Sequence, residues 1–199
     1  MEVAIGDQIW MVENLNVDRF RNGDPIPNAV KVKEWKDAWE NKQPAWCHYK
    51  LDPANGAAYG KLYNCYAVMD PRGLAPEGWH IPSIEEWDRL IAAIGGIDTF
   101  EAGKWAYDIL RSRDGWEYYS GLNTEQTNSI GFSGMPAGER GLNGLFDGIG
   151  DGTYWWSTTE EVHPMRNEYE VWTMQLGYGS VNRNPREKGK GFSVRCLKD

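Results

Sequence analysis

The chain has 199 residues and a formal net charge of −8, and its 21 basic side chains form no basic run. Because binding to nucleic acid needs clustered Lys and Arg, this composition argues against a nucleic-acid partner. No apolar run reaches the ~18 residues of a transmembrane helix, and the length fits a single domain over residues 1–199.

The first third of the chain predicts short elements separated by turns. Apolar periodicity marks the helix and the strands, and clusters of Gly, Pro, Asn and Asp mark the turns. In chain order, the pattern predicts two short strands within 3–15, a helix over 34–40, a strand within 44–52, a turn at 52–56 and either a helix or a strand at 61–68.

Two longer helices are predicted in the middle of the chain. Ser83 followed three residues later by Glu86 is a capping box, and an apolar face continues from there to Gly95. A second helix is expected over residues 100–110. Residues 114–151 are rich in Gly, Asn and Ser and predict a long, mostly irregular loop.

The C-terminal third has the pattern of a rigid apolar frame that carries a changeable polar surface. Successive residues of a strand point to opposite sides, so we expect one residue of the pair Trp155–Trp156 in the core and the other partly exposed. Alternate apolar residues place one side of strand 171–176 in the core. Residues 177–188 predict a polar loop, and residues 191–196 a final strand.

Six motifs occur in an order that resembles the Fibrobacter succinogenes major paralogous domain family. The resemblance covers almost the whole chain. The motifs are Ile5-Gly-Asp-Gln-Ile-Trp-Met-Val-Glu-Asn-Leu15, Tyr59-Gly-Lys-Leu-Tyr63, Ala75-Pro-Glu-Gly-Trp-His-Ile-Pro82, Ser129-Ile-Gly-Phe-Ser133, Trp155-Trp-Ser-Thr-Thr159 and Gly191-Phe-Ser-Val-Arg-Cys196.

This resemblance implies an α+β, C-type-lectin-like fold of the variant shared with formylglycine-generating enzyme. Such a fold would have a small twisted antiparallel sheet, two helices and long irregular loops. The resemblance also implies a secreted or surface-attached bacterial protein, which requires that a signal peptide has been removed; a cytoplasmic location stays open. The terminal third is also similar to the variable proteins of diversity-generating retroelements.

In those variable proteins a C-terminal segment contacts the ligand, and the strand periodicity transfers this role to outward-facing positions of the present chain. The expected ligand is a protein or a carbohydrate, and the domain is expected to be a monomer or a weak oligomer. The candidate contacts are Trp156, Glu160, His163, Arg166, Thr173, Gln175, Tyr178, Asn182, Asn184 and Arg186.

Patterns typical of catalysis are weak. Formylglycine-generating enzyme uses a C-terminal cysteine pair, whereas the only cysteine in this region is Cys196, which we expect to be structural. Cys47, Cys65 and Cys196 leave the disulfide state open, and His80 is expected to be a hydrogen-bonded structural histidine. We therefore expect non-catalytic recognition; a hydrolase or oxidoreductase on the same fold and a structural or adhesive module are the alternatives.

The segment Asp147-Gly-Ile-Gly-Asp-Gly152 places two carboxylates among glycines. Calcium prefers six to eight oxygen ligands on a flexible loop, and this segment offers some of them. Asp and Gly also form turns, which is the alternative role here. No cofactor is expected, and a structural calcium ion stays open as an alternative.

Overall fold

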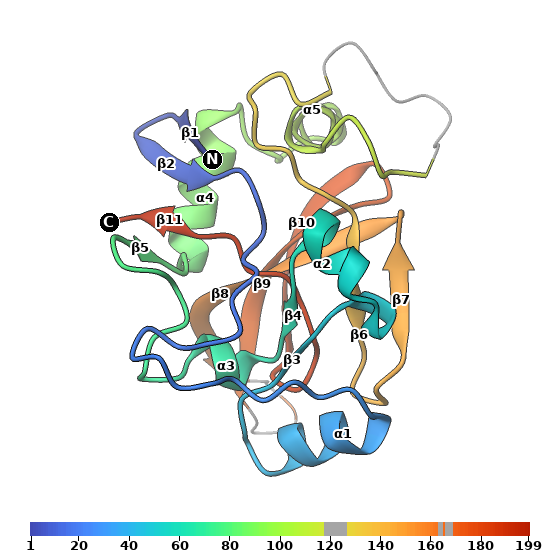
Figure 1. Cartoon of the computed structure of the whole chain (residues 1–199). Helices are drawn as coiled ribbons and strands as arrows, with labels where there is room; N and C mark the ends of the chain where they lie inside the picture. The colour runs from blue at the N-terminus through green and yellow to red at the C-terminus, as the bar shows by residue number, and fades with distance from the viewer. Residues whose placement is uncertain (118–126, 163–164, 166–168) are drawn as a thin grey trace.

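The computed structural model describes residues 1–117, 127–162, 165 and 169–199, which form a mixed α+β fold with three sheets (Figure 1). The helices are α1 (Val32–Glu40), α2 (Pro53–Tyr59), α3 (Cys65–Val68), α4 (Ile84–Ala93), α5 (Phe100–Leu110) and the 3₁₀ helix η1 (Tyr49–Leu51). The strands are β1 (Glu2–Ile5), β2 (Gln8–Met11), β3 (Trp46–Cys47), β4 (Leu62–Tyr63), β5 (Trp79–His80), β6 (Ala137–Arg140), β7 (Phe146–Ile149), β8 (Gly152–Val162), β9 (Tyr169–Gly177), β10 (Ser180–Glu187) and β11 (Leu197–Lys198). The sheets have the orders β1-β2-β11-β5, β10-β9-β8-β6-β7 and β3-β4.

The local signals of the two central helices are confirmed. Helix α4 begins after Ser83, whose hydroxyl accepts a hydrogen bond from the Glu86 amide, while the Glu86 carboxylate accepts one from the Ser83 amide. Helix α5 covers the predicted residues and is capped by the hydroxyl of Thr99. The strands predicted within residues 3–15 correspond to β1 and β2, which pair antiparallel.

The helix predicted over 34–40 is confirmed as α1. The two helices implied by the family resemblance are too few, because α1, α2 and α3 accompany α4 and α5 in the described part of the chain. The predicted turn at 52–56 is the start of α2. Its Asp52 carboxylate accepts a hydrogen bond from the Ala54 amide at 2.9 Å, and Pro53 occupies the first helical position, where its missing N–H costs nothing. Residues 61–68 contain both a strand, β4, and a helix, α3.

The predicted loop at 177–188 is wrong, because β10 pairs antiparallel with β9 along its whole length. The two strands are joined by Tyr178 and Gly179, whose φ values of 53° and 74° are both positive, as a two-residue hairpin turn requires. Pro185 fits because β10 is the edge strand of its sheet. The predicted irregular stretch at 114–151 likewise contains the β6–β7 hairpin, and β6 pairs parallel with β8, so this sheet is not purely antiparallel.

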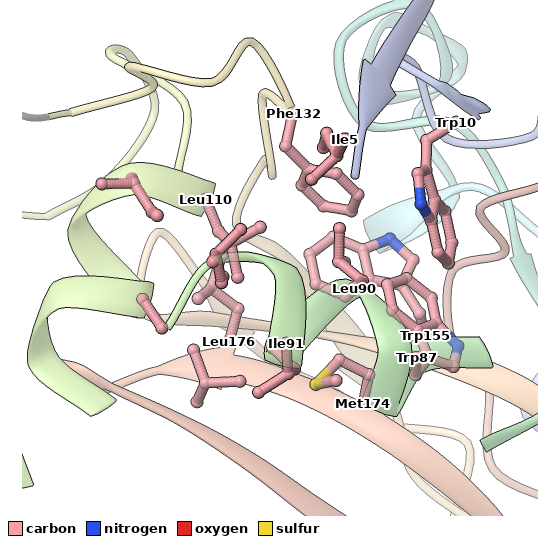
Figure 2. Close-up of a cluster of buried hydrophobic side chains, with 14 of the residues drawn as sticks. Ile5, Trp10, Trp87, Leu90, Ile91, Leu110, Phe132, Trp155, Met174 and Leu176 are labelled. Carbon is pink, nitrogen blue, oxygen red and sulfur yellow. The ribbon is translucent and has the colours of Figure 1, made fainter. Parts of the chain in front are cut away.

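One side of the β8–β9–β10 sheet packs on α4 and α5 through a core of large aromatic side chains (Figure 2). Trp155 of β8 stacks on Trp87 of α4 with a centroid distance of 5.7 Å, and Phe132 meets the edge of this pair. Met174 and Leu176 of β9 point to the same core, as their spacing predicts. Buried aromatic pairs of this kind stabilise a fold beyond the area that they bury.

The opposite side of the sheet holds a second core, to which the next residue, Trp156, belongs. Its indole lies 4.7 Å from the Phe192 ring and donates a hydrogen bond to the Tyr63 carbonyl at 2.8 Å. Both tryptophans are therefore buried, and the prediction that one is partly exposed is wrong. Residues 191–196 cover this side as an extended segment held by isolated bridges, rather than as the regular strand that was predicted.

All three cysteines are free, fully buried thiols. Burial raises the pKa of Cys47 to about 11 and the pKa values of Cys65 and Cys196 to about 12, so the reactive thiolate is scarce at neutral pH. The expectation that Cys196 is structural agrees with this burial.

We expect the native protein to resist thiol-specific reagents such as dithionitrobenzoate, and to react at all three cysteines once it is unfolded in guanidinium. Counting the released chromophore before and after denaturation measures this. Fast reaction of even one thiol in the native state would contradict the burial of these side chains.

Candidate functional site

A polar face lies on the same side of the sheet as Trp156, toward β10 and the end of β9. Strand alternation and register create it: Tyr154, Gln175 and Asn182 form one row across β8, β9 and β10, and Trp156, Thr173 and Asn184 form the next. We define the polar face as Tyr154, Gln175, Tyr178, Asn182, Asn184 and Arg186.

The structure brings together five of the residues that the sequence nominated. Gln175, Asn182, Asn184 and Arg186 share one side of the β9–β10 hairpin, and Tyr178 lies in its turn with 62% of its surface exposed. Asn182 is exposed, and the other three are partly exposed. These side chains are accessible and mainly polar, which suits contact with a polar ligand.

Two nominated residues, Trp156 and Thr173, have no exposed surface and cannot contact a ligand in this conformation. Trp156 and the neighbouring Val171 belong to the second core, which covers the β8 and β9 positions of this row. The Thr173 hydroxyl donates a hydrogen bond to the Asn184 carbonyl at 2.8 Å, which satisfies it inside the hairpin. The prediction was wrong for these two positions.

Of the remaining nominated residues, the structure describes Glu160 alone, near the end of β8 that is farther from the Tyr178 turn. Glu160 is exposed on β8, aligns with Val171, and forms an ion pair with Lys188. His163 and Arg166 lie outside the described residues. Glu160 thus shares the register row of Arg186, but its carboxylate is engaged by Lys188.

Tyr154 is a member of the polar face that the sequence reasoning missed. Its hydroxyl accepts a hydrogen bond from the Gln175 side-chain amide at 3.2 Å, and its ring stacks on Phe192 at 4.8 Å. Its period-two spacing from Trp156 was the available signal, because both lie on the same side of β8.

The phenol groups of the polar face are hydrogen-bond donors over a wide pH range. Burial and then the nearby Glu139 carboxylate raise the pKa of Tyr154. Partial burial, followed by the carboxylates of Asp151 and Asp147, raises the pKa of Tyr178. Both hydroxyls thus stay protonated at neutral pH and can donate to a ligand oxygen.

A hollow of about 550 Å³ lies beside the β6–β7 hairpin. Glu139, Asn143, Phe146, Asp147 and Lys190 are among the residues that line it, and Lys190 forms an ion pair with Glu139 at 3.1 Å. Glu139 and Asp147 also act on the tyrosines of the polar face. Lys190, which lines the hollow, also lies 5.8 Å from the centre of the Phe192 ring, on which Tyr154 of the polar face stacks, so the hollow is close to that face.

His80 is hydrogen-bonded between two carboxylates, as expected for a structural histidine. Its Nδ1 lies 2.9 Å from Asp199 Oδ1, and its Nε2 lies 3.2 Å from Glu86 Oε1. The adjoining hollow of about 290 Å³ is lined, in the described part of the chain, by side chains that include no Ser, Thr or Cys. This arrangement therefore lacks the nucleophile that a Ser–His–Asp or Cys–His mechanism requires.

Within the described ranges, no three His, Cys, Asp or Glu side chains lie close enough together to hold a metal ion. Asp147 is exposed, and its carboxylate accepts a hydrogen bond from the Gly148 amide at 2.9 Å, which is the behaviour of a turn residue. None of the described helices is both long and apolar enough to span a bilayer.

Comparison with known proteins gave one finding. The family model described as the Fibrobacter succinogenes major domain matches residues 3–198. No curated protein and no solved structure matches the chain.

Proposed function

The chain belongs to the Fibrobacter succinogenes major domain family, and we propose that it is a non-catalytic recognition domain of a bacterial surface or secreted protein. Its ligand, a protein or a carbohydrate, contacts the polar face. One observation carries this proposal: accessible polar side chains of β9 and β10 stand on a sheet that is anchored by aromatic cores on both sides. Such an arrangement lets contact residues vary while the frame stays fixed.

Recognition fits the chemistry of the polar face better than catalysis does. The groups that it presents are amides, phenols held in the protonated form and one guanidinium, and none of these is a general base at neutral pH. The three thiols are buried with raised pKa values, which argues against a cysteine-dependent oxidoreductase.

We extend the proposal to five further properties of the protein. The fold is of the C-type-lectin-like class, the protein works outside the cell after removal of a signal peptide, and the domain is a monomer or a weak oligomer. Substitution of polar-face residues, as in the variable proteins of diversity-generating retroelements, would change the ligand without disturbing the frame. A structural calcium ion at the turn of residues 147–152 would have to take most of its ligands from backbone carbonyls and water, because no cluster of three acidic, His or Cys side chains is present among the described residues.

The proposal is tested by binding the purified domain to a glycan array and to an array of host and bacterial surface proteins, with calcium or with a chelator. A specific hit supports recognition, and loss of that hit with the chelator supports the calcium ion. If the folded domain binds neither array, the recognition proposal fails and the structural-module alternative is favoured.

The triple substitution Gln175→Ala, Tyr178→Ala and Asn182→Ala should abolish the array hit and leave the melting temperature almost unchanged. These side chains are accessible and contribute little to either core, and a few contacts usually carry most of the binding energy. The matched control replaces Gln43, Asn28 and Phe100, which are exposed residues of similar kinds far along the chain from the face. Equal loss of binding in both variants would contradict the assignment of the site.

A further inference from the structure

Among the described arginines that are at least partly buried, Arg186 differs from the others because its guanidinium has no hydrogen-bond acceptor. It donates no hydrogen bond and forms no ion pair within the described chain, and its Nε is inaccessible to solvent without an acceptor. The others each donate to at least one oxygen: Arg72, Arg111, Arg140 and Arg195. A donor that is desolvated without a partner is unfavourable, so an unpaired guanidinium needs an explanation.

The position of Arg186 connects it to the rest of the polar face. It pairs with Val171 in the sheet register, yet its guanidinium lies 5.8 Å from the centre of the Tyr154 ring. The side chain therefore runs along the face toward Tyr154, past the Thr173–Asn184 pair. The guanidinium is held beside the row that contains Tyr154, Gln175 and Asn182.

Two of the nearby carboxylates are engaged by other cations, and a third, Asp147, forms no ion pair with Arg186. Glu160, which shares the register row of Arg186, pairs with Lys188. Glu139, which lies close enough to affect the pKa of Tyr154, pairs with Lys190. The positive charge of Arg186 thus has no carboxylate partner among the described residues, which leaves it available to a group from outside the domain.

We propose that Arg186 is the anion-binding residue of the polar face, and that the ligand is a sugar with a carboxylate group, such as a uronic acid. This inference rests on the proposed function. The planar guanidinium binds a carboxylate through two parallel hydrogen bonds. The amides of Gln175, Asn182 and Asn184 supply donors and acceptors for the sugar hydroxyls beside it.

The surroundings favour an acidic sugar over an acidic protein surface. A protein partner is usually anchored by buried aromatic or aliphatic side chains at the centre of the interface. The centre of this face is instead a row of amides with the half-buried Tyr154, and its most exposed ring, Tyr178, lies at the edge. Amides and a tyrosine edge complement a small, strongly polar ligand.

The test follows the side-chain Nε–H signals of the arginines by NMR while D-glucuronate or D-glucose is added to the full chain. The two sugars share a ring and differ at C6, where only glucuronate carries a carboxylate. Glucuronate should shift the Arg186 Nε–H signal in a saturable manner, and glucose should not. Arg186→Gln should weaken glucuronate binding about tenfold or more, as expected for loss of a charge-assisted hydrogen bond.

Arg183→Gln is the matched control, because Arg183 is on the same strand but pairs with Asp88 of α4. It should bind glucuronate like the wild type, and both variants should melt like the wild type. A third titration, with acetate, separates an acidic sugar from any carboxylate. An equal response to acetate, or equal weakening in the two arginine variants, would overturn the assignment.

The glucuronate titration and the array experiment can fail independently of each other. If the triple variant loses its array hit while glucuronate leaves Arg186 unchanged, the polar face stands as the site and the role of Arg186 is refuted. If Arg186 responds to glucuronate but the triple substitution leaves array binding intact, the anion site stands and the proposed recognition function fails.

Discussion

Replacing Arg195 with methionine should lower the free energy of unfolding by about 3–5 kcal/mol, as for other buried charged groups whose partners are left behind. Arg195 is fully buried, and its guanidinium donates to the carbonyls of Val12 and Phe132 at 2.6 and 2.7 Å and to the Asn14 side chain at 2.8 Å. Burial lowers its pKa to about 9, so it remains charged at neutral pH. Methionine fills the space but leaves these buried acceptors unsatisfied.

Guanidinium denaturation followed by tryptophan fluorescence measures this loss, with Arg183→Met as the exposed control. Arg195→Lys should fall between the wild type and Arg195→Met, because an ammonium keeps the charge but reaches fewer of the acceptors. The usual net value of a single hydrogen bond is about 1 kcal/mol. If the free energy of unfolding of Arg195→Met differs from that of the wild type by no more than this, Arg195 does not hold the N-terminal strands against the end of the chain.

Replacing Trp156 with alanine should also destabilise the protein by about 3–5 kcal/mol, the usual cost of removing a large aromatic side chain from a core. Its indole packs on Phe192 and bonds to the Tyr63 carbonyl, so its loss leaves both a cavity and an unpaired acceptor. At a temperature where this variant is still folded, it should bind the array ligand as well as the wild type does.

Tyr178→Ala is the comparison for Trp156→Ala, because it should do the opposite: weaken binding and leave the unfolding transition in place. Thermal melts and array binding of both variants measure the two effects. A Trp156→Ala protein with normal stability and no binding would mean that this tryptophan is a ligand contact after all, and that the division into frame and surface is wrong.

The elements that the sequence predicted well are those whose signals are local. The Ser83 cap, its partner Glu86 and the apolar face that follows fix α4 within ten residues of chain. Strand β10 was missed because its turn, Tyr178–Gly179, lacks the Asn-Gly or Asp-Gly signature of two-residue hairpins, and because Pro185 argues against a strand until its edge position is known.

For the candidate site, the sequence predicted only which side of a strand a residue faces. Alternation placed Gln175 on the outward side correctly, because a period of two is a property of the strand itself, whereas Asn182 and Asn184 were nominated from a segment predicted to be a loop. It failed for Trp156 and Thr173, because their burial depends on a second core that includes segments distant in sequence. No local pattern records that long-range contact.

The sequence also could not predict that Arg186 has no ion-pair partner among the described residues. That depends on the pairing of Glu139 with Lys190 and of Glu160 with Lys188, which are long-range contacts. Sequence nominated Arg186 as a contact, and the structure adds that its guanidinium is left without an oxygen partner among the described residues.

The most direct measurement is a backbone amide NMR map of the domain with the first ligand found on the arrays. The account predicts that the shifted signals are confined to the polar face and its strands, around Gln175, Tyr178, Asn182 and Arg186. Shifts centred on the hollow beside His80, with the β9–β10 hairpin unchanged, would contradict it and would place the ligand site on the other sheet.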